Sequence, residues 1–258
     1  MAAPAAPKTP EQIMADTIAN HPVFGRQNNT YNAATQNRVV HIVGCGSLGS
    51  YIGLLLAKLG IKNFVLWDSD SVAQHNVANQ AFGNDAVGRK KTEELERIIR
   101  ANSTWTTATR NVVGPPRLTI SEEENFTENS IIADEDCVIF SVADSITPRQ
   151  LVYNNTQNNV FIIDARTGSE YGQMFCCDKS VAKDRKQYEQ FAMVLPPGGA
   201  EDGDCGMQSI AYSTAAVATM AVNSYIRFVN KQPYPHKLDF DFPSYDLMLF
   251  KSNGEVKA

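Results

Sequence analysis

A glycine-rich turn between a strand-like and a helix-like segment constrains this fold more than any other feature of the sequence. The β-branched run 39–43 is typical of a buried strand, and it stops at Gly44. Apolar residues then recur every three or four positions over 47–59, the spacing of a helix that packs on a sheet. The apolar run 64–67 predicts a second strand. Strand, glycine turn, helix and strand within about 30 residues predict the βαβ unit of a doubly wound parallel sheet.

The alternation of strands and helices continues along the chain, which predicts an α/β fold with a doubly wound, mostly parallel, Rossmann-like sheet in a single domain. Cys176 and Cys177 lie in one of the predicted strands. We expect a disordered N-terminal tail over 1–20, and one domain over 21–258 that contains a crossover loop at about 191–208. The other expected elements are helices over 87–101, 147–155 and 209–230, and strands over 107–113, 136–142, 160–163, 238–242 and 246–251.

Composition excludes several classes of protein. With 43% hydrophobic and 20% charged residues, the chain resembles an ordinary globular domain. Its net charge of −5 gives no general attraction for nucleic acid or for an anionic membrane, and no apolar run approaches the roughly 20 residues of a membrane-spanning helix. Five cysteines without a C-x-x-C pair indicate neither a disulfide framework nor a four-thiolate zinc site. We therefore expect a cytoplasmic protein with no nucleic-acid or membrane partner.

The glycine turn also predicts a ligand. Gly44, Gly46 and Gly49 form the pattern G-x-G-x-x-G where a strand passes into a helix that begins at Ser47. The backbone N–H groups of such a turn and the helix dipole favour an anion such as a nucleotide phosphate. Asp68 ends the next strand 19 residues past Gly49, where a carboxylate accepts hydrogen bonds from ribose hydroxyls. These residues predict a nucleotide site without choosing between NAD and ATP, and the alternative is a turn that serves only tight helix–sheet packing.

Four further segments extend this pattern. The strand that ends at Asp68 continues as D-S-D, residues 76–80 read N-V-A-N-Q, residues 87–91 read V-G-R-K-K, and a later strand ends in A-D-S at 143–145. In this order and spacing the sequence resembles the ThiF/MoeB/HesA family of adenylating enzymes, part of the ubiquitin-activating-enzyme-like superfamily. The resemblance runs over about 39–229. It implies ATP as the nucleotide, Mg²⁺ as the cofactor, and adenylation of a carboxylate as the reaction.

The resemblance also implies roles for single residues. Asp68 would hold the ribose, Lys91 the phosphates and Asp144 the Mg²⁺ ion. Transfer of AMP to a carboxylate brings two anions together, and positive charge must offset their repulsion. Lys91 would supply this charge directly and Asp144 through the Mg²⁺ ion that it holds, so both count as catalytic. From the residues alone, two alternatives stay open: Lys91 on a solvated helix face, and Asp144 as the cap of the next helix. The other residues implied at the nucleotide are Asp70, Asn76, Asn79 and Gln80, beside Gly44, Gly46, Ser47 and Gly49.

Two positions depart from the family's pattern. Asn79 stands where the family has an arginine that contacts the γ-phosphate, and Ser145 stands where the family has the asparagine of T-D-N. These departures leave open a catalytically degenerate scaffold with the adenylation fold, or an inactive partner subunit. A second alternative is an NAD(P)-dependent oxidoreductase, which would leave Gln80, Lys91 and Asp144 without a shared purpose.

Cys205 follows the predicted crossover loop and precedes the last long helix. Thiolating members of the family carry a cysteine in this register, so the resemblance makes Cys205 a candidate nucleophile that takes the acyl group after adenylation. The helix dipole lowers the pKa of such a thiol, whereas Asp202 and Asp204 raise it, and a structural thiol is the alternative. The resemblance further implies a homodimer, and a small ubiquitin-like or sulfur-carrier protein with a Gly-Gly tail as the partner.

Overall fold

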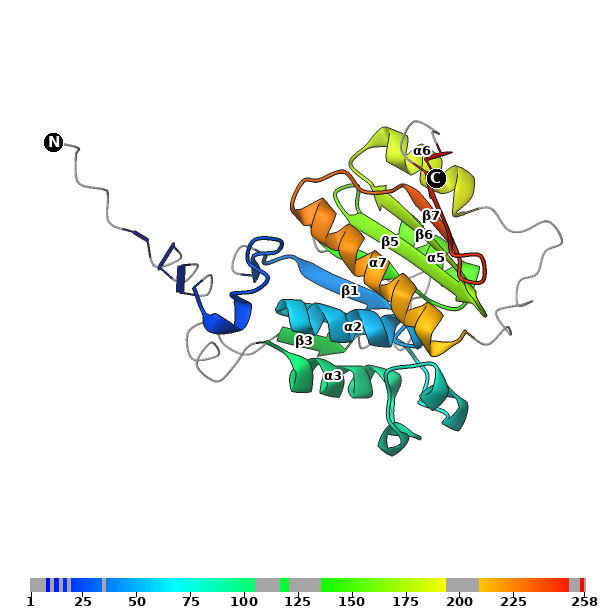
Figure 1. Cartoon of the computed structure of the whole chain (residues 1–258), viewed down its shortest axis with the longest axis horizontal. Helices are drawn as coiled ribbons and strands as arrows, with labels where there is room; N and C mark the ends of the chain where they lie inside the picture. Colours follow the sequence, from blue (N-terminus) through cyan, green and yellow to red (C-terminus); the bar gives the residue numbers. More distant parts are fainter. Residues whose placement is uncertain are drawn as a thin grey trace.

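The computed structural model describes residues 8–9, 12–13, 16–17, 20–33, 36–104, 117–120, 136–193, 209–250 and 256–257. Within these ranges the strands form one nine-stranded sheet in the order β3-β2-β1-β4-β5-β6-β7-β8-β9 (Figure 1). The strands are β1 (Val39–Val43), β2 (Asn63–Trp67), β3 (Arg117–Ile120), β4 (Val138–Ser141), β5 (Phe161–Gly168), β6 (Tyr171–Asp178), β7 (Lys237–Asp241), β8 (Asp246–Phe250) and β9 (Val256–Lys257). The helices are α2 (Ser47–Leu59), α3 (Lys91–Asn102), α5 (Ile146–Asn154), α6 (Ala182–Phe191) and α7 (Ala211–Val229), with the 3-10 turns η1 (Pro22–Phe24), η3 (Gln74–Ala78) and η4 (Asn84–Ala86).

One half of the sheet is parallel and the other half is antiparallel. Strands β3, β2, β1, β4 and β5 run parallel, and β6 to β9 follow as antiparallel neighbours. Val43 lies opposite Trp67 on β2 and Ser141 on β4, and Ser141 lies opposite Asp164 on β5. The carboxyl ends of these parallel strands therefore meet at one edge, where open α/β sheets bind ligands. This arrangement confirms the α/β, Rossmann-like fold predicted from the sequence, although the sheet is mixed rather than mostly parallel, because β6 to β9 are added as antiparallel neighbours.

Helices cover both faces of the sheet. Helices α2 and α7 pack against each other on one face, and Figure 1 shows them side by side across it. Alternating side chains of each strand divide the core: Ile42 and Phe161 join the cluster under α2 and α7, whereas Val43 and Ile162 join the cluster that includes α5 and α6. Because both faces are covered, these strands are largely apolar where they cross the core, and this is why they appear in the sequence as nearly continuous apolar runs, interrupted in β1 by His41.

Two helices differ from the expectation. Helix α3 begins at Lys91 rather than at position 87, because η4 and Gly88, with a φ of 89°, interrupt the helix before it. Helix α6 was not expected. Only Asp184 and Tyr188 of its ten residues are buried, so it carries no apolar stripe that a sequence pattern would reveal. The strand expected over 107–113 lies outside the described residues, as does most of the predicted crossover loop.

Residues before β1 contribute to the core. Phe24, Tyr31 and Ala33 are buried, and the hydroxyl oxygens of Tyr31 and Tyr225 on α7 lie 3.2 Å apart. This packing connects the region just after the predicted tail to the sheet. In the part of the chain that the structure describes, no helix combines the length and the apolar character needed to cross a membrane.

Candidate functional site

The glycine turn lies between β1 and α2 and packs closely on its neighbours. Gly44 has a φ of 97°, and a Cβ atom on it would lie 2.7 Å from the amide nitrogen of Ala143. A Cβ atom on Gly49 would lie 1.9 Å from the carbonyl oxygen of Gly44. The fold itself therefore requires glycine at both positions. Gly46 differs, because a Cβ atom there would meet no atom closer than 3.8 Å.

Helix α2 begins at Ser47, directly after this turn. Its N-cap residue is Gly46, and no side chain among the described residues caps it. The first N–H groups of a helix have no intrahelical acceptor, and the positive end of the helix dipole adds to their charge. The turn and the start of α2 thus present backbone donors at the edge where the sequence predicts a phosphate.

Asp68 follows β2 and is fixed by two backbone donors. The amide of Cys45 donates to Oδ2 at 2.7 Å, and the amide of Asp70 donates to Oδ1 at 2.8 Å. Burial raises the pKa of Asp68, although Lys91 and the two amides act in the opposite direction. The carboxylate links the glycine turn to the end of β2, in the position that a ribose-binding carboxylate takes in this class of sheet.

Lys91 is the first residue of α3, and its ammonium group lies at the same edge. Its Nζ atom is 2.6 Å from Oδ2 of Asp70; the Lys91 side chain is 11% exposed, whereas that of Asp70 is 59% exposed. A Cβ atom on Gly46 would lie 4.0 Å from this Nζ atom and 3.8 Å from Nε2 of Gln80. The structure therefore brings Lys91, Gln80 and Gly46 together, and the alternative of a solvated lysine is wrong.

The turn η3 and the residues after it carry the three predicted amide side chains. Asn76 is buried, and its Oδ1 accepts a hydrogen bond from the amide of Ala73 at 2.8 Å, so Asn76 holds the turn itself. Asn79 donates from Nδ2 to Oγ of Ser209 at 3.2 Å. Within the described residues, Oδ1 of Asn79 and Oε1 of Gln80 are buried without a partner. Buried acceptors of this kind indicate a place for a water molecule or a ligand donor.

Asp144 lies just past the carboxyl end of β4 and is exposed. Helix α5 begins at Ile146 with Ser145 as its N-cap residue, so Asp144 is not the N-cap residue of this helix. Cys205 lies outside the described residues, and its place beside the site remains a prediction.

The charges at this edge suit a divalent cation. Asp68, Asp70 and Asp144 contribute three carboxylates, and two lysines lie beside them: Lys91 on Asp70, and Lys90 on the carbonyl oxygen of Ser69. The described residues contain no group of three histidine, cysteine or acidic side chains that could hold a metal by themselves. Mg²⁺ commonly uses one or two carboxylates and completes its shell with water and substrate phosphates. Asp144 therefore fits an ion that binds together with a nucleotide.

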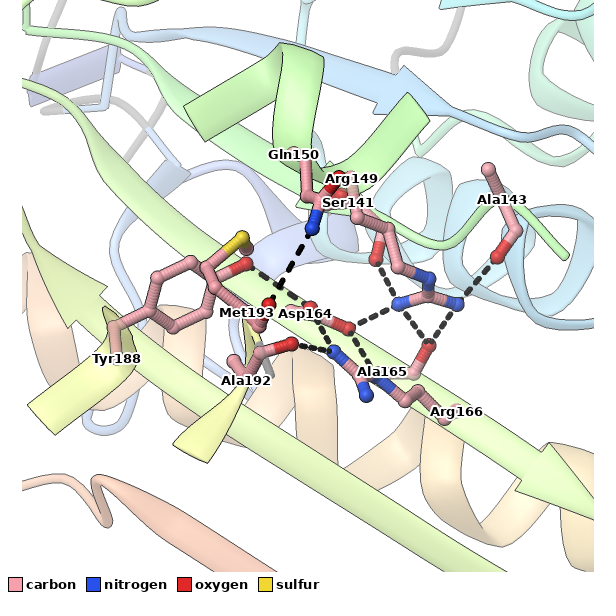
Figure 2. A network of polar contacts seen from close by, with 10 residues as sticks. All are labelled: Ser141, Ala143, Arg149, Gln150, Asp164, Ala165, Arg166, Tyr188, Ala192 and Met193. Atoms are coloured by element: carbon pink, nitrogen blue, oxygen red, sulfur yellow. Dashed lines mark hydrogen bonds and ion pairs between the residues drawn. The ribbon is translucent and has the colours of Figure 1, made fainter. Parts of the chain in front are cut away.

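A second polar cluster, which no sequence pattern marks as a unit, lies where β4 and β5 end. Asp164 on β5 is fully buried and forms ion pairs with Arg149 of α5 and Arg166 of β5 (Figure 2). Tyr188 of α6 donates its hydroxyl proton to the same carboxylate at 3.0 Å. Burial acts to raise the pKa of Asp164, but the two arginines bring this pKa below its usual value. Asp164 and Arg166 are neighbours on β5, but Arg149 and Tyr188 come from α5 and α6, so a single sequence carries no local signal for the cluster as a whole.

Comparison with known proteins identifies the family. The model of the ThiF family matches residues 21–255. The chain belongs to the ThiF family. Two uncharacterized proteins of Sinorhizobium fredii match parts of this ThiF-family chain. The protein y4oA is 27% identical over 129 residues, which cover 47% of this chain and 22% of y4oA. The protein y4qC is 32% identical over 74 residues, which cover 29% of this chain and 13% of y4qC. The chain thus matches less than a quarter of the length of these curated relatives.

Solved structures share the fold of this ThiF-family chain. One structure of E. coli MccB is 19% identical, with a TM-score of 0.61 over 89% of this chain and 70% of MccB. A structure of E. coli MccB with MccA-N7isoASN is 18% identical, with a TM-score of 0.64 over 89% of this chain and 72% of MccB. PaaA is 15% identical, with a TM-score of 0.61 over 87% of this chain and 80% of PaaA. At these identities the likeness establishes the fold.

Proposed function

We propose that this chain binds ATP with Mg²⁺ at the carboxyl edge of its parallel strands and transfers AMP to a carboxylate of a peptide or small protein. The observation that carries the proposal is the convergence of Gly46, Gln80 and Lys91 near Asp68. It joins an anion-binding turn, a cation and a ribose-type carboxylate at one edge. Two neighbours in fold support the choice of ligand, since E. coli MccB has been solved with ATP, and with AMPCPP and MccA.

The reaction requires two anions to approach each other. An oxygen of the substrate carboxylate attacks the α-phosphorus of ATP, the bond from this phosphorus to the bridging oxygen breaks, and pyrophosphate leaves with the electron pair. Lys91 supplies positive charge to the phosphates once they displace Asp70 from its ammonium group. Mg²⁺ held between Asp144 and the phosphates would supply further positive charge for the leaving pyrophosphate.

The remaining polar groups fit the rest of the nucleotide. The Asp68 oxygens accept one backbone hydrogen bond each, and a carboxylate oxygen has two lone pairs, so both can also accept from ribose hydroxyls. Nε2 of Gln80 is a donor near Gly46 and suits a phosphate oxygen. The unpartnered Oε1 of Gln80 accepts only from a donor, so it suits a hydroxyl or amino group.

For the substrate we propose the flexible C-terminal tail of a small ubiquitin-like or sulfur-carrier protein, as the resemblance to the family implies. A Gly-Gly tail would suit this role, because glycine lets a backbone pass where a side chain does not fit. MccB, a neighbour in fold, has been solved in complex with N-formylated MccA, which supports the proposal of a peptide or small protein as the substrate. A homodimer, and acyl transfer to Cys205, belong to the same proposal.

One observation favours a second candidate, a scaffold that has lost activity. Asn79 places a neutral amide where the family has an arginine, and its Nδ2 is already bonded to Ser209. A site with one cation fewer binds the γ-phosphate less tightly. Nucleotide binding separates the two candidates before any carrier protein is known.

The test is thermal unfolding of the wild type and of Asp144→Ala with Mg-ATP, Mg-AMP or NAD. Asp246→Ala is the matched control, because it removes an exposed carboxylate at the start of β8. A ligand at about 100 times its Kd adds roughly 2.7 kcal/mol, which raises Tm by about 5–10 °C. We expect Mg-ATP to stabilise the wild type and the control, and Asp144→Ala to lose the Mg²⁺-dependent part. Stabilisation by NAD alone would indicate an oxidoreductase, and no stabilisation by any nucleotide would indicate the scaffold.

A further inference from the structure

The buried carboxylate of Asp164 lies at the centre of a polar network at the edge of the sheet. Arg149 pairs with Oδ1, and Arg166 donates from Nε to Oδ1 at 3.1 Å and from its terminal nitrogen to Oδ2 at 2.9 Å. Tyr188 donates to Oδ2 at 3.0 Å. Figure 2 shows that both guanidinium groups meet the same carboxylate oxygen, Oδ1, and that the Tyr188 hydroxyl reaches the other oxygen. One carboxylate thus orients two arginines.

The first arginine reaches the chain beside the proposed nucleotide site. Arg149 donates to the carbonyl oxygens of Ser141 at 3.0 Å, of Ala165 at 3.1 and 3.2 Å, and of Ala143. Ala143 directly precedes Asp144, so Arg149 fixes the carbonyl group of the peptide unit from which Asp144 extends. The position of the Asp144 carboxylate at the edge depends on this peptide unit.

The second arginine reaches the end of α6. Arg166 donates to the carbonyl oxygen of Ala192 at 2.7 Å, and its guanidinium carbon lies 5.1 Å from the centre of the Phe175 ring. One residue later, the carbonyl oxygen of Met193 accepts a hydrogen bond from Gln150 of α5 at 3.4 Å. These contacts fix the point from which the chain leaves α6 toward the segment that contains Cys205.

We propose that Asp164 is a positioning residue of the nucleotide site. Through Arg149 it holds the backbone that carries Asp144, and through Arg166 it holds the backbone at Ala192 and Met193, directly after α6. The inference rests on the proposed function for its link to ATP, but the contacts of Arg149 and Arg166 do not depend on that function. Buried charges of this kind add little net stability over well-packed apolar side chains, and their directional bonds can define one geometry. The network therefore fits the role of placing two parts of the chain.

The test uses Asp164→Asn and Arg166→Gln, with Lys179→Met as the matched control. Lys179 is a buried cation that donates to the carbonyl oxygens of Tyr153 and Thr156 at 2.6 and 2.7 Å, near the opposite end of α5. Asp164→Asn leaves the buried Arg149 uncompensated, and Lys179→Met removes a buried cation, so both disturb a buried charge bonded to main-chain oxygens, at different ends of α5. Arg166→Gln removes a half-buried cation bonded to the carbonyl oxygen of Ala192.

Two readouts are measured: hydrogen–deuterium exchange of the backbone, and the Kd of ATP in excess Mg²⁺ and in EDTA. For Asp164→Asn we expect exchange over 142–146 and 190–193 to become at least tenfold faster. We expect its Kd for Mg-ATP to rise at least tenfold, with less than a threefold change in EDTA. Arg166→Gln should loosen 190–193 and leave 142–146 nearly unchanged. Lys179→Met should loosen 153–157 alone.

Several outcomes would overturn the proposal. Asp164→Asn could exchange as the wild type does over both segments, or lose affinity equally with and without Mg²⁺, as a purely structural residue would. If Asp164→Asn does not fold, the exchange rates of Arg166→Gln test the proposal instead. Faster exchange over the whole chain in that variant, and not over 190–193 alone, would contradict separate roles for Arg149 and Arg166. A wild type that binds no ATP in either buffer refutes the proposed function, while the exchange data still decide whether Asp164 positions the two segments.

Discussion

Lys91 meets Asp70 twice: its ammonium group lies 2.6 Å from a carboxylate oxygen of Asp70, and its amide donates to the carbonyl oxygen of Asp70 at 2.9 Å. The start of α3 is thereby held against the loop after β2. The pair with Asp70 therefore holds the Lys91 ammonium group near Gly46 without a bound nucleotide. Because the Asp70 carboxylate is mostly exposed, an arriving phosphate can replace it at little cost.

Replacing Lys91 by methionine is expected to weaken ATP binding at least tenfold while changing stability by less than about 1 kcal/mol. The pair with Asp70 is half exposed, and such pairs contribute only about 0–1 kcal/mol. Isothermal titration with Mg-ATP and urea unfolding measure the two effects. Lys186→Met is the control, because Lys186 lies exposed on α6. An unchanged Kd in Lys91→Met would remove this lysine from the site.

Replacing Gly49 by alanine is expected to destabilise the fold by about 3 kcal/mol, because the new Cβ atom would stand 1.9 Å from a backbone oxygen. For a chain of this size the loss lowers Tm by roughly 6–12 °C. Gly168→Ala is the control, since no atom lies within 4 Å of the new Cβ atom, and a change below about 0.5 kcal/mol is expected. Scanning calorimetry of both variants checks the difference, and equal Tm values would contradict it.

Gly46→Ala tests the opposite property of the same turn. The new Cβ atom would be 3.8 Å from Gln80 and 4.0 Å from the ammonium group of Lys91, which is ordinary contact, so Tm should stay within about 3 °C of the wild type. The methyl group would occupy the space in front of the donors, and ATP affinity should fall at least tenfold. Intact ATP binding in this variant would show that the turn serves packing alone.

Local patterns locate some of this architecture and miss the rest for physical reasons. The unit β1–α2–β2 is predictable because buried parallel strands are largely apolar, and Asp68 stands out as the acidic residue that ends such a run. Lys91 is predictable as a motif residue, but its burial against Asp70 is not. The pairing of Arg149 with Asp164 joins α5 to β5 and leaves no periodic trace in one sequence.

Asp164 is expected to make stability depend on acid pH. Its folded-state pKa is lowered, so its contribution to stability is present above the usual pKa of about 4 and is lost as the pH falls through the lower folded-state pKa. Asp164→Asn, which leaves the buried Arg149 and the half-buried Arg166 uncompensated, should cost about 3–5 kcal/mol at pH 7. Urea unfolding at pH 7, 5, 4 and 3 should show this difference shrinking only below pH 4. A difference that stays constant down to pH 3 would argue against the ion pairs.

Cys205 is expected to be the acceptor if an acyl group is transferred to the enzyme. The described cysteines are poor candidates: burial raises the pKa of Cys45 well above its usual value and that of Cys176 to about 12, so neither is a thiolate at neutral pH. Cys205→Ser should retain ATP binding and carrier-dependent pyrophosphate exchange within twofold.

Intact-mass spectrometry after incubation with ATP and a candidate carrier checks the second half of this expectation. Wild type and Cys137→Ala, which changes a buried thiol, should both gain an adduct that hydroxylamine releases, whereas Cys205→Ser should not. An adduct that persists in Cys205→Ser would move the acceptor to another side chain. Loss of pyrophosphate exchange in this variant would place Cys205 in the adenylation step itself, because a serine hydroxyl preserves the size of the side chain but forms no thiolate.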